Sequence, residues 1–144
     1  MAGIRVNTDD RRIEVNDKGE SIVLNFSDQS FPNRVFAMIE RVQARGEQAK
    51  AEEAALREKY KDSEDQMAFT REAAALNEAI HRSIMAEVDG VFGMETCRKV
   101  FGDIVPDITL FEDFFRQLLP YFEKYGRERA EKMGKYSAAR TGNV

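Results

Sequence analysis

The side chains that could do chemistry are one histidine, one cysteine and a few adjacent carboxylates. His81 is the only histidine among the 144 residues, so any nucleophilic triad with a histidine base would have to include it. The periodicity of the surrounding residues places His81 off the apolar stripe of its helix, which predicts a solvated side chain. Cys97 is the only cysteine and is predicted to be a buried or half-buried thiol. A Cys–His pair is the alternative that the spacing leaves open.

Adjacent carboxylates occur at Glu52-Glu53 and at Glu64-Asp65, where a divalent ion could bind or water could be polarised. Neighbours in sequence point about 100° apart on a helix, so these pairs are expected to face solvent. The sequence has no glycine-rich phosphate loop and no cysteine–histidine set with metal-ligand spacing. We therefore expect no catalytic residue, no metal and no cofactor, and a protein that is not an enzyme.

Composition narrows the partners and the location. The formal net charge is −4 and 33% of the residues are charged, which indicates a mixed-sign surface and argues against nucleic acid as the main partner. No run approaches the roughly 18 apolar residues of a membrane span, and the start of the sequence lacks the apolar core of a signal peptide. We expect a single-domain cytoplasmic protein that does not enter a membrane.

Residues 1–30 are predicted to form a small β unit. Apolar side chains recur at every second position of residues 21–26, which is typical of a strand with one buried face. Residues 16–19, Asn-Asp-Lys-Gly, are suited to a turn, so residues 12–15 should pair with this strand. Residues 4–7 are a candidate third strand. Because two strands alone are marginally stable, the apolar face needs a helix to cover it.

Residues 31–89 are predicted to form a long antiparallel helical hairpin. Ser30 is a candidate N-cap, and an unbroken helix over residues 31–60 would be about 45 Å long at 1.5 Å per residue. A domain this small cannot cover that length, so the far half should project. Gly46 is the weak point at which this helix could bend. Ser63, with a glutamine three residues later, matches the capping box that starts a returning helix.

Residues 94–136 are predicted to form the C-terminal helices, and residues 137–144 a flexible tail. A short helix over residues 94–101 precedes a longer one, for which Thr109 and a glutamate three residues later form a capping box. Pro120 cannot donate a backbone hydrogen bond, so a kink or break is expected there. The predicted fold class is mainly α (α+β), with a small N-terminal β-hairpin, a long helical hairpin and an aromatic-rich C-terminal region.

The longer C-terminal helix carries the most informative pattern of the chain. At 100° per residue, its large apolar side chains fall within an arc of about 100°, and Leu110, Leu119 and Tyr121 widen that arc at both edges. This aromatic stripe either packs as the domain core, since a soluble monomer rarely exposes such a patch, or meets another chain in part. On the second interpretation the candidate partner-binding residues are Phe111, Phe114, Phe115, Leu118, Phe122 and Tyr125.

A basic stretch follows the aromatic stripe and could contact phosphates. Glutamates interrupt it and no aromatic stacking platform accompanies it, so a helical nucleic-acid-associated regulatory protein is the weaker alternative. The pattern favours a protein–protein adaptor or assembly chaperone. The basic residues concerned are Arg127, Arg129, Lys132, Lys135 and Arg140.

Several segments also share their order and character with a known family. They are Cys97-Arg98-Lys99-Val100-Phe101-Gly102, the acidic-aromatic helix from Leu110 to Leu119, Pro-Tyr-Phe-Glu-Lys-Tyr-Gly at 120–126, the Lys135-Tyr136-Ser137 ending, and Phe31-Pro32-Asn33-Arg34-Val35-Phe36 near the N-terminus. In these the chain resembles the small tail assembly chaperones of long-tailed, siphovirus-type phages and prophages of Gram-positive bacteria.

The resemblance implies a non-enzymatic, mainly helical viral protein that works in the cytoplasm of the bacterial host. Such proteins coat the tape-measure protein during phage tail assembly, commonly form homo-oligomers and help to recruit tail-tube protein subunits. A virion or prophage structural subunit or adaptor is the alternative within the same class of interaction proteins. A chaperone would leave the finished particle, whereas a structural subunit would stay in it.

Overall fold

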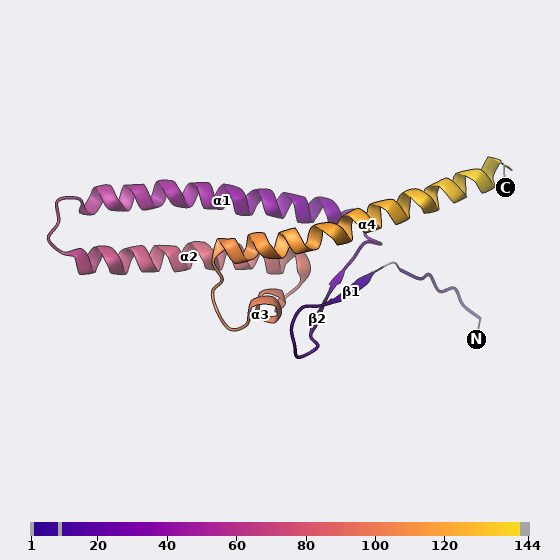
Figure 1. Ribbon diagram of the computed structural model, residues 1–144, viewed down its shortest axis with the longest axis horizontal. Coiled ribbons are helices and arrows are strands. Elements are labelled where there is room, and N and C mark those ends of the chain that lie inside the picture. The colour runs from indigo at the N-terminus through magenta and orange to yellow at the C-terminus, as the bar shows by residue number, and fades with distance from the viewer. Residues whose placement is uncertain (1, 9, 142–144) are drawn as a thin grey trace. The chain divides into compact units, whose positions relative to one another are not determined.

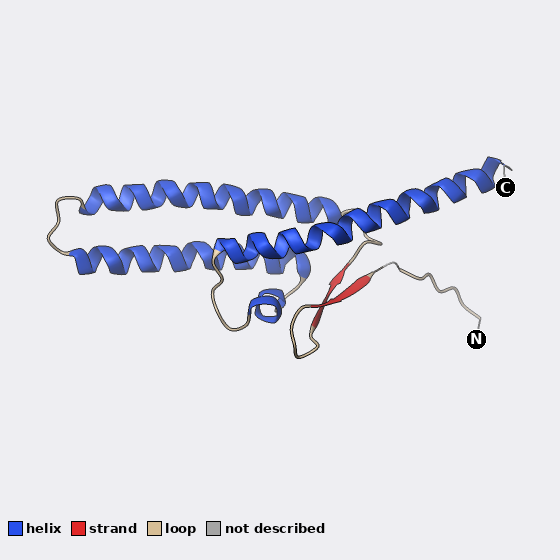
Figure 2. Cartoon of the chain, in the orientation of Figure 1, coloured by secondary structure: helices blue, strands red, loops and turns tan. Residues whose placement is uncertain are grey.

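The computed structural model describes residues 2–8 and 10–141, and it confirms a mainly α fold with a small N-terminal β-hairpin (Figures 1 and 2). The contacts within the chain divide it into two compact units, one ending at Leu110 and one starting at Phe111. The elements, in chain order, are β1 (Arg11–Glu14), β2 (Ser21–Leu24), α1 (Phe31–Tyr60), α2 (Gln66–Phe92), α3 (Thr96–Phe101) and α4 (Ile108–Thr141).

The two strands form the predicted antiparallel hairpin. The register runs from Arg11 opposite Leu24 to Glu14 opposite Ser21. The first strand therefore begins and ends one residue earlier than predicted, and the second strand ends two residues earlier. The candidate third strand at residues 4–7 does not form, since these residues have no regular secondary structure and are exposed. The sheet therefore depends on the helices of its own unit for a covered apolar face.

The helical hairpin is formed by α1 and α2, which lie side by side and antiparallel (Figure 1). The first helix is unbroken over the 30 residues for which a continuous helix would be about 45 Å long. It therefore runs through Gly46 without ending. A Cβ built on Gly46 would lie 3.0 Å from Cδ1 of Ile108, so this glycine allows a side chain from the start of α4 to approach α1 closely.

Of the two predicted serine caps of the hairpin, Ser30 is at the predicted position but makes no capping hydrogen bond, and Ser63 is not the cap. Ser30 occupies the N-cap position of α1, but its hydroxyl makes no cap and instead donates to Asp28 at 2.7 Å. The N-cap of α2 is Asp65, whose carboxylate accepts from the backbone N–H of Ala68 at 3.0 Å. The hydroxyl of Ser63 is already occupied, because it accepts from the backbone N–H of Asp65. A carboxylate nearer the helix therefore takes the capping role.

The core of the first unit lies at the root of the hairpin, where the N-terminal half of α1 meets the C-terminal half of α2. Three rings form an edge-to-face series there, with centroids 6.0 Å apart for Phe26 and Phe31 and 5.9 Å apart for Phe31 and Phe92. The second helix also contacts β2 and α3. The other buried apolar side chains of the two helices are Val35, Met38, Val42, Ile80, Ile84 and Val88.

The last helix, α4, is 34 residues long and continues through Pro120. We predicted a kink or a break there, and of the two the break is wrong, because the helix tolerates the loss of one N–H donor without ending. Residues 137–141 of the predicted flexible tail (137–144) belong to α4, where alanine and arginine favour a helix. Residues 142–144 lie outside the described part of the chain.

Candidate interaction surface

The aromatic stripe lies along α4, and its rings contact one another within that helix. The ring centroids of Phe111 and Phe115 are 6.4 Å apart, and those of Phe114 and Phe115 are 6.0 Å apart. The ring planes are tilted by 34° and 45°. These separations are within the range of favourable aromatic pairs, so the rings order one another along the helix.

Exposure divides the six predicted partner-binding residues into two groups. The first group, which is buried to 8% exposure or less, consists of Phe111, Phe114, Phe115 and Leu118, whereas Phe122 and Tyr125 are half-buried. At the edges of the stripe, Leu110, Leu119 and Tyr121 are 41%, 44% and 41% exposed. The accessible apolar surface of the first turns of α4 therefore lies at the edges of the stripe.

The stripe also continues past the residues that we predicted. At 100° per residue Met133 and Tyr136 fall on the same face as Phe115 and Leu118, and they are 52% and 63% exposed. The signal was present in the sequence as a continued helical period. The prediction stopped at Tyr125 because the residues that follow were interpreted as a basic stretch and a flexible tail.

His81 is not solvated, so that prediction is wrong. Its side chain is buried because the segment before α4 covers this face of α2. The ring Nδ1 lies 2.8 Å from the carbonyl oxygen of Asn77, and Nε2 lies 3.5 Å from Oδ1 of Asp107. The two ring nitrogens thus face a carbonyl oxygen and a carboxylate oxygen. Neither group is a nucleophile that a histidine base would activate by removing a proton. The contact with Asp107 connects the segment before α4 to α2.

Asp107, the residue before α4, caps that helix in place of the predicted cap Thr109. Its carboxylate accepts from the backbone N–H of Thr109 at 3.1 Å and from the hydroxyl of the same residue at 2.6 Å. These hydrogen bonds, and to a smaller extent the nearby His81, hold the pKa of Asp107 below the ordinary value of an aspartate. The charged carboxylate is therefore favoured at the helix N-terminus.

The prediction of a buried thiol at Cys97 is confirmed. The side chain is 1% exposed, and its Sγ donates a long hydrogen bond of 3.7 Å to the carbonyl oxygen of Met85. Burial, with a smaller effect from the carboxylate of Asp89, raises the pKa of the Cys97 thiol well above its usual range. Because the thiolate is the reactive form, this environment suppresses the nucleophile that a Cys–His pair would need.

The carboxylate pairs occupy structural positions on the hairpin. Glu52 forms an ion pair with Arg45 at 3.0 Å, and Asp65 caps α2. Glu53 and Glu64 are exposed. Within residues 2–8 and 10–141, no group of three or more histidine, cysteine, aspartate or glutamate side chains is placed to hold a metal ion.

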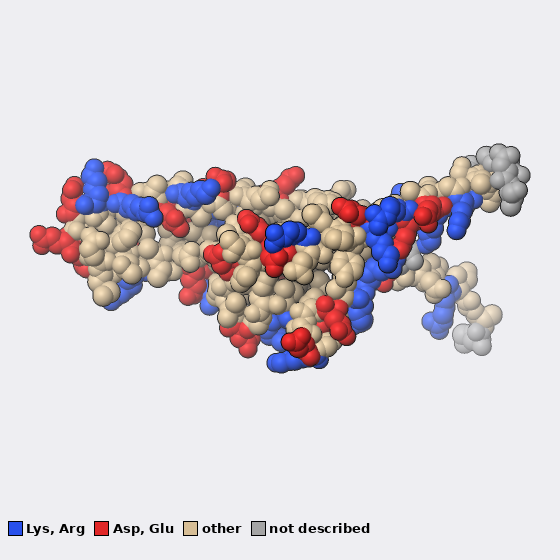
Figure 3. Space-filling model, in the orientation of Figure 1, with Lys and Arg blue, Asp and Glu red and all other residues tan. Residues whose placement is uncertain are grey.

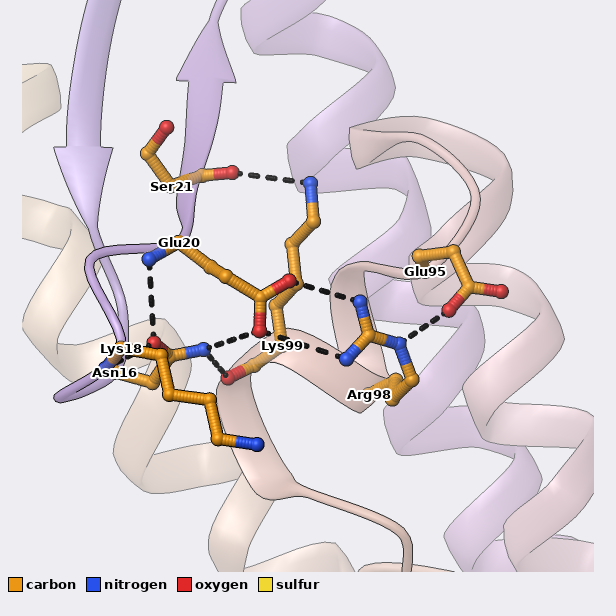
Figure 4. A network of polar contacts seen from close by, with 7 residues as sticks. All are labelled: Asn16, Lys18, Glu20, Ser21, Glu95, Arg98 and Lys99. Atoms are coloured by element: carbon orange, nitrogen blue, oxygen red, sulfur yellow. Dashed lines mark hydrogen bonds and ion pairs between the residues drawn. The ribbon is translucent and has the colours of Figure 1, made fainter.

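A network of polar contacts joins the turn of the β-hairpin to α3 (Figure 4). Arg98 donates from Nη2 to Oε2 of Glu20 at 2.9 Å and also pairs with Glu95. Asn16 donates to Oε1 of Glu20 at 3.1 Å and to the carbonyl oxygen of Lys99 at 3.0 Å. The network links positions about 80 residues apart, so no local sequence pattern could predict it.

The electrostatics of this network favour the charged forms. The hydrogen bond from Arg98, followed by the one from Asn16, lowers the pKa of Glu20 below that of an ordinary glutamate. The stabilisation from a carboxyl with a lowered pKa is complete above its unfolded-state pKa and is lost as the pH falls through the folded-state pKa. The contacts of Glu20 therefore weaken only in acid. At neutral pH the network holds the turn of the β-hairpin against α3.

None of the helices among the described residues combines the length and the apolar character needed to cross a bilayer.

The fold and the surface define a mainly helical protein built on a long antiparallel hairpin, with an aromatic stripe along its last helix. A family model described as "Family of unknown function (DUF6673)" matches residues 18–143, and the chain belongs to this family. Neither the curated proteins nor the solved structures gave a match.

Proposed function

We propose that the protein is a non-enzymatic tail assembly chaperone of a phage or prophage, which binds and shields the tape-measure protein and helps to recruit tail-tube subunits in the cytoplasm of the host. The single observation that carries the proposal is the exposed apolar surface at the two edges of the stripe: Leu119 on one edge and Tyr121 on the other are 44% and 41% exposed, on either side of the half-buried Phe122. The sequence resemblance to such chaperones agrees with it.

Apolar side chains exposed along both edges of an aromatic stripe suit a long helical client. An apolar helix in water gains about 25 cal/mol for each Å² of apolar surface that a partner covers, and aromatic side chains commonly dominate such contacts. Recognition of a helical client by an apolar surface requires anchors at helical spacing, which this stripe supplies. Exposed charged residues on the other faces of α4, such as Glu112, Arg116 and Lys124, would keep a complex dispersed.

The test must use exposed residues, because aspartate at the buried Phe115 or Leu118 is expected to disturb the fold itself. We would co-express the chain with the tape-measure protein of the same phage genome and measure the tape-measure protein recovered in solution with the chain bound. The wild-type chain should keep the client soluble. The double variant Leu119→Glu/Tyr121→Glu should lose most of that recovery while its helix content, followed by circular dichroism, stays unchanged.

Lys124→Glu is the matched control, because it changes the net charge by the same amount at an exposed position on the face opposite the stripe. It should leave recovery at the wild-type level. If the wild-type chain fails to keep the tape-measure protein soluble, or if both variants lose recovery equally, the proposal is wrong. Finding the chain in purified, finished tails by mass spectrometry would instead support a structural subunit.

A further inference from the structure

The far end of the helical hairpin carries a shallow apolar groove between α1 and α2. We call residues 47–79 the hairpin tip and this hollow the tip groove. Leu56 and Leu76 are half-buried in it, while the alanines beside them are exposed. Small side chains at a groove allow a helix to approach closely. The side chains that line it include Glu52, Ala55, Leu56, Glu72, Ala75 and Leu76.

The hairpin tip is acidic. Residues 47–79 contain nine aspartates or glutamates and five lysines or arginines. At the groove, Glu72 pairs with Lys59 at 3.2 Å and Glu52 pairs with Arg45 at 3.0 Å, and these side chains are between 27% and 61% exposed. Exposed pairs contribute little free energy, so the carboxylates can exchange partners when another cation approaches.

The C-terminal part of α4 has the opposite charge. Residues 127–141 contain five lysines or arginines and two glutamates, and blue side chains gather there with a few red ones in Figure 3. The exposed side chains of Met133 and Tyr136 lie one helical turn apart, and the helical period places Arg129 and Lys132 on the same side. This helix end therefore presents an apolar pair flanked by cations.

We propose that the tip groove of one copy binds the C-terminal part of α4 of a second copy. Met133 and Tyr136 would lie over Leu56 and Leu76, and the flanking cations would meet the acidic tip. Charge complementarity of this kind steers and orients association. Each chain carries one groove and one helix end, so the contact is heterologous and generates a ring or an open filament. The contact requires no client and stands independently of the proposed chaperone function.

The first test is the mass of the purified chain by light scattering across a wide concentration range, at about 50 mM and about 500 mM salt. We expect a mass that rises with concentration and an apparent dissociation constant that increases at least about tenfold at the higher salt, because the contact is partly ionic. A chain that is monomeric at every concentration, or an oligomer that is insensitive to salt, would overturn the proposal.

Charge reversal locates the two surfaces. The variants Glu52→Lys/Glu72→Lys and Arg129→Glu/Lys132→Glu should each weaken self-association at least about tenfold. An equimolar mixture of the two should associate again, because the unchanged groove of one variant meets the unchanged helix end of the other, and the two reversed surfaces match as well. Glu40→Lys, an exposed reversal on the root half of α1, should change nothing. A mixture that stays monomeric while both variants remain helical would contradict the proposed contact.

Cross-linking gives a second measurement that does not depend on charge. Ala75→Cys and Met133→Cys would be made in separate chains and mixed under oxidising conditions, with the buried Cys97 left in place. We expect a disulfide-linked heterodimer. An Ala79→Cys chain mixed with Met133→Cys serves as the control, because Ala79 is exposed on α2 but does not line the groove. Equal cross-linking of both mixtures would argue against a specific contact.

Discussion

The root and the tip of the helical hairpin are built from the same two helices, yet they differ in how completely they bury their apolar stripes. At the root, Met38 and Ile84 are 0% and 1% exposed, because the β-hairpin and α3 of the same unit add further layers there. At the tip, Leu56 and Leu76 are only half-buried. The difference shows that two helices alone cannot enclose a core, so the stability of this unit comes mainly from the root.

The tip compensates with contacts at its surface. The rings of Tyr60 and Phe69 meet edge to face with centroids 5.8 Å apart, and Lys59 pairs with Glu72 across the two helices. Such contacts each contribute about 1 kcal/mol or less. They hold the helices together while leaving apolar surface accessible. A binding surface requires such accessible apolar side chains, whereas at the root these side chains are buried.

The largest effect is expected from a truncation at the root. Ile84→Ala removes a buried side chain whose surroundings cannot close over the cavity, and it should lower the free energy of unfolding by about 2–5 kcal/mol. Urea unfolding followed by circular dichroism measures this loss, with Ile84→Val as a control that should cost about 0.5–1.5 kcal/mol. A loss below 1 kcal/mol for the alanine variant would break the contrast between root and tip.

A smaller effect is expected from the equivalent truncation at the tip. Leu76→Ala lies on the same helix and removes an isomeric side chain, but the leucine is only half-buried, so the loss should be about 1 kcal/mol. The same unfolding measurement applies, at a concentration where the chain is monomeric. Hydrogen exchange should show faster opening at residues 56–76 with the root unchanged. A loss as large as that of Ile84→Ala would mean that the tip shares the core.

The smallest effect is expected at the boundary between the two halves. Gly46→Ala gains about 1 kcal/mol of helix propensity, but the new Cβ would press on Cδ1 of Ile108, so the net change should be within about 0.5 kcal/mol. In an Ile108→Val background, which lacks that atom, the same substitution should stabilise the chain by about 1 kcal/mol. Unfolding of the four chains of this cycle measures the coupling. The same effect in both backgrounds would show that the close approach has no energetic cost.

The sequence predicted those parts of the fold that depend on local pattern. The first helix extends over the residues that its periodicity indicated, and α3 ends at residue 101, where the predicted short helix ended. Gly46 was identified as a weak point, but its reason, the approach of Ile108, lies 62 positions away in the sequence. The burial of His81 was missed for the same cause, because Asp107 belongs to a distant segment.

The candidate surface was predicted in part. The aromatic residues of α4 follow from helical spacing, and the structure adds which of them are accessible: burial of Phe111 and exposure of Tyr121 depend on packing, which periodicity cannot rank. The choice of Asp65 over Ser63 as a cap was a competition between neighbouring side chains, and spacing alone did not decide it. The function of the stripe stays a prediction until the binding tests are made.

The buried Cys97 is an intrinsic probe of local opening in this protein. It is the only thiol and lies in α3, which follows α2. Its hydrogen-bond partner is a backbone carbonyl oxygen of α2. A thiol reagent can modify it only in moments when this corner of the root opens, so the rate of modification counts those openings without any added label. The rate at which Cys97 is modified therefore measures how often the most stable part of the fold opens.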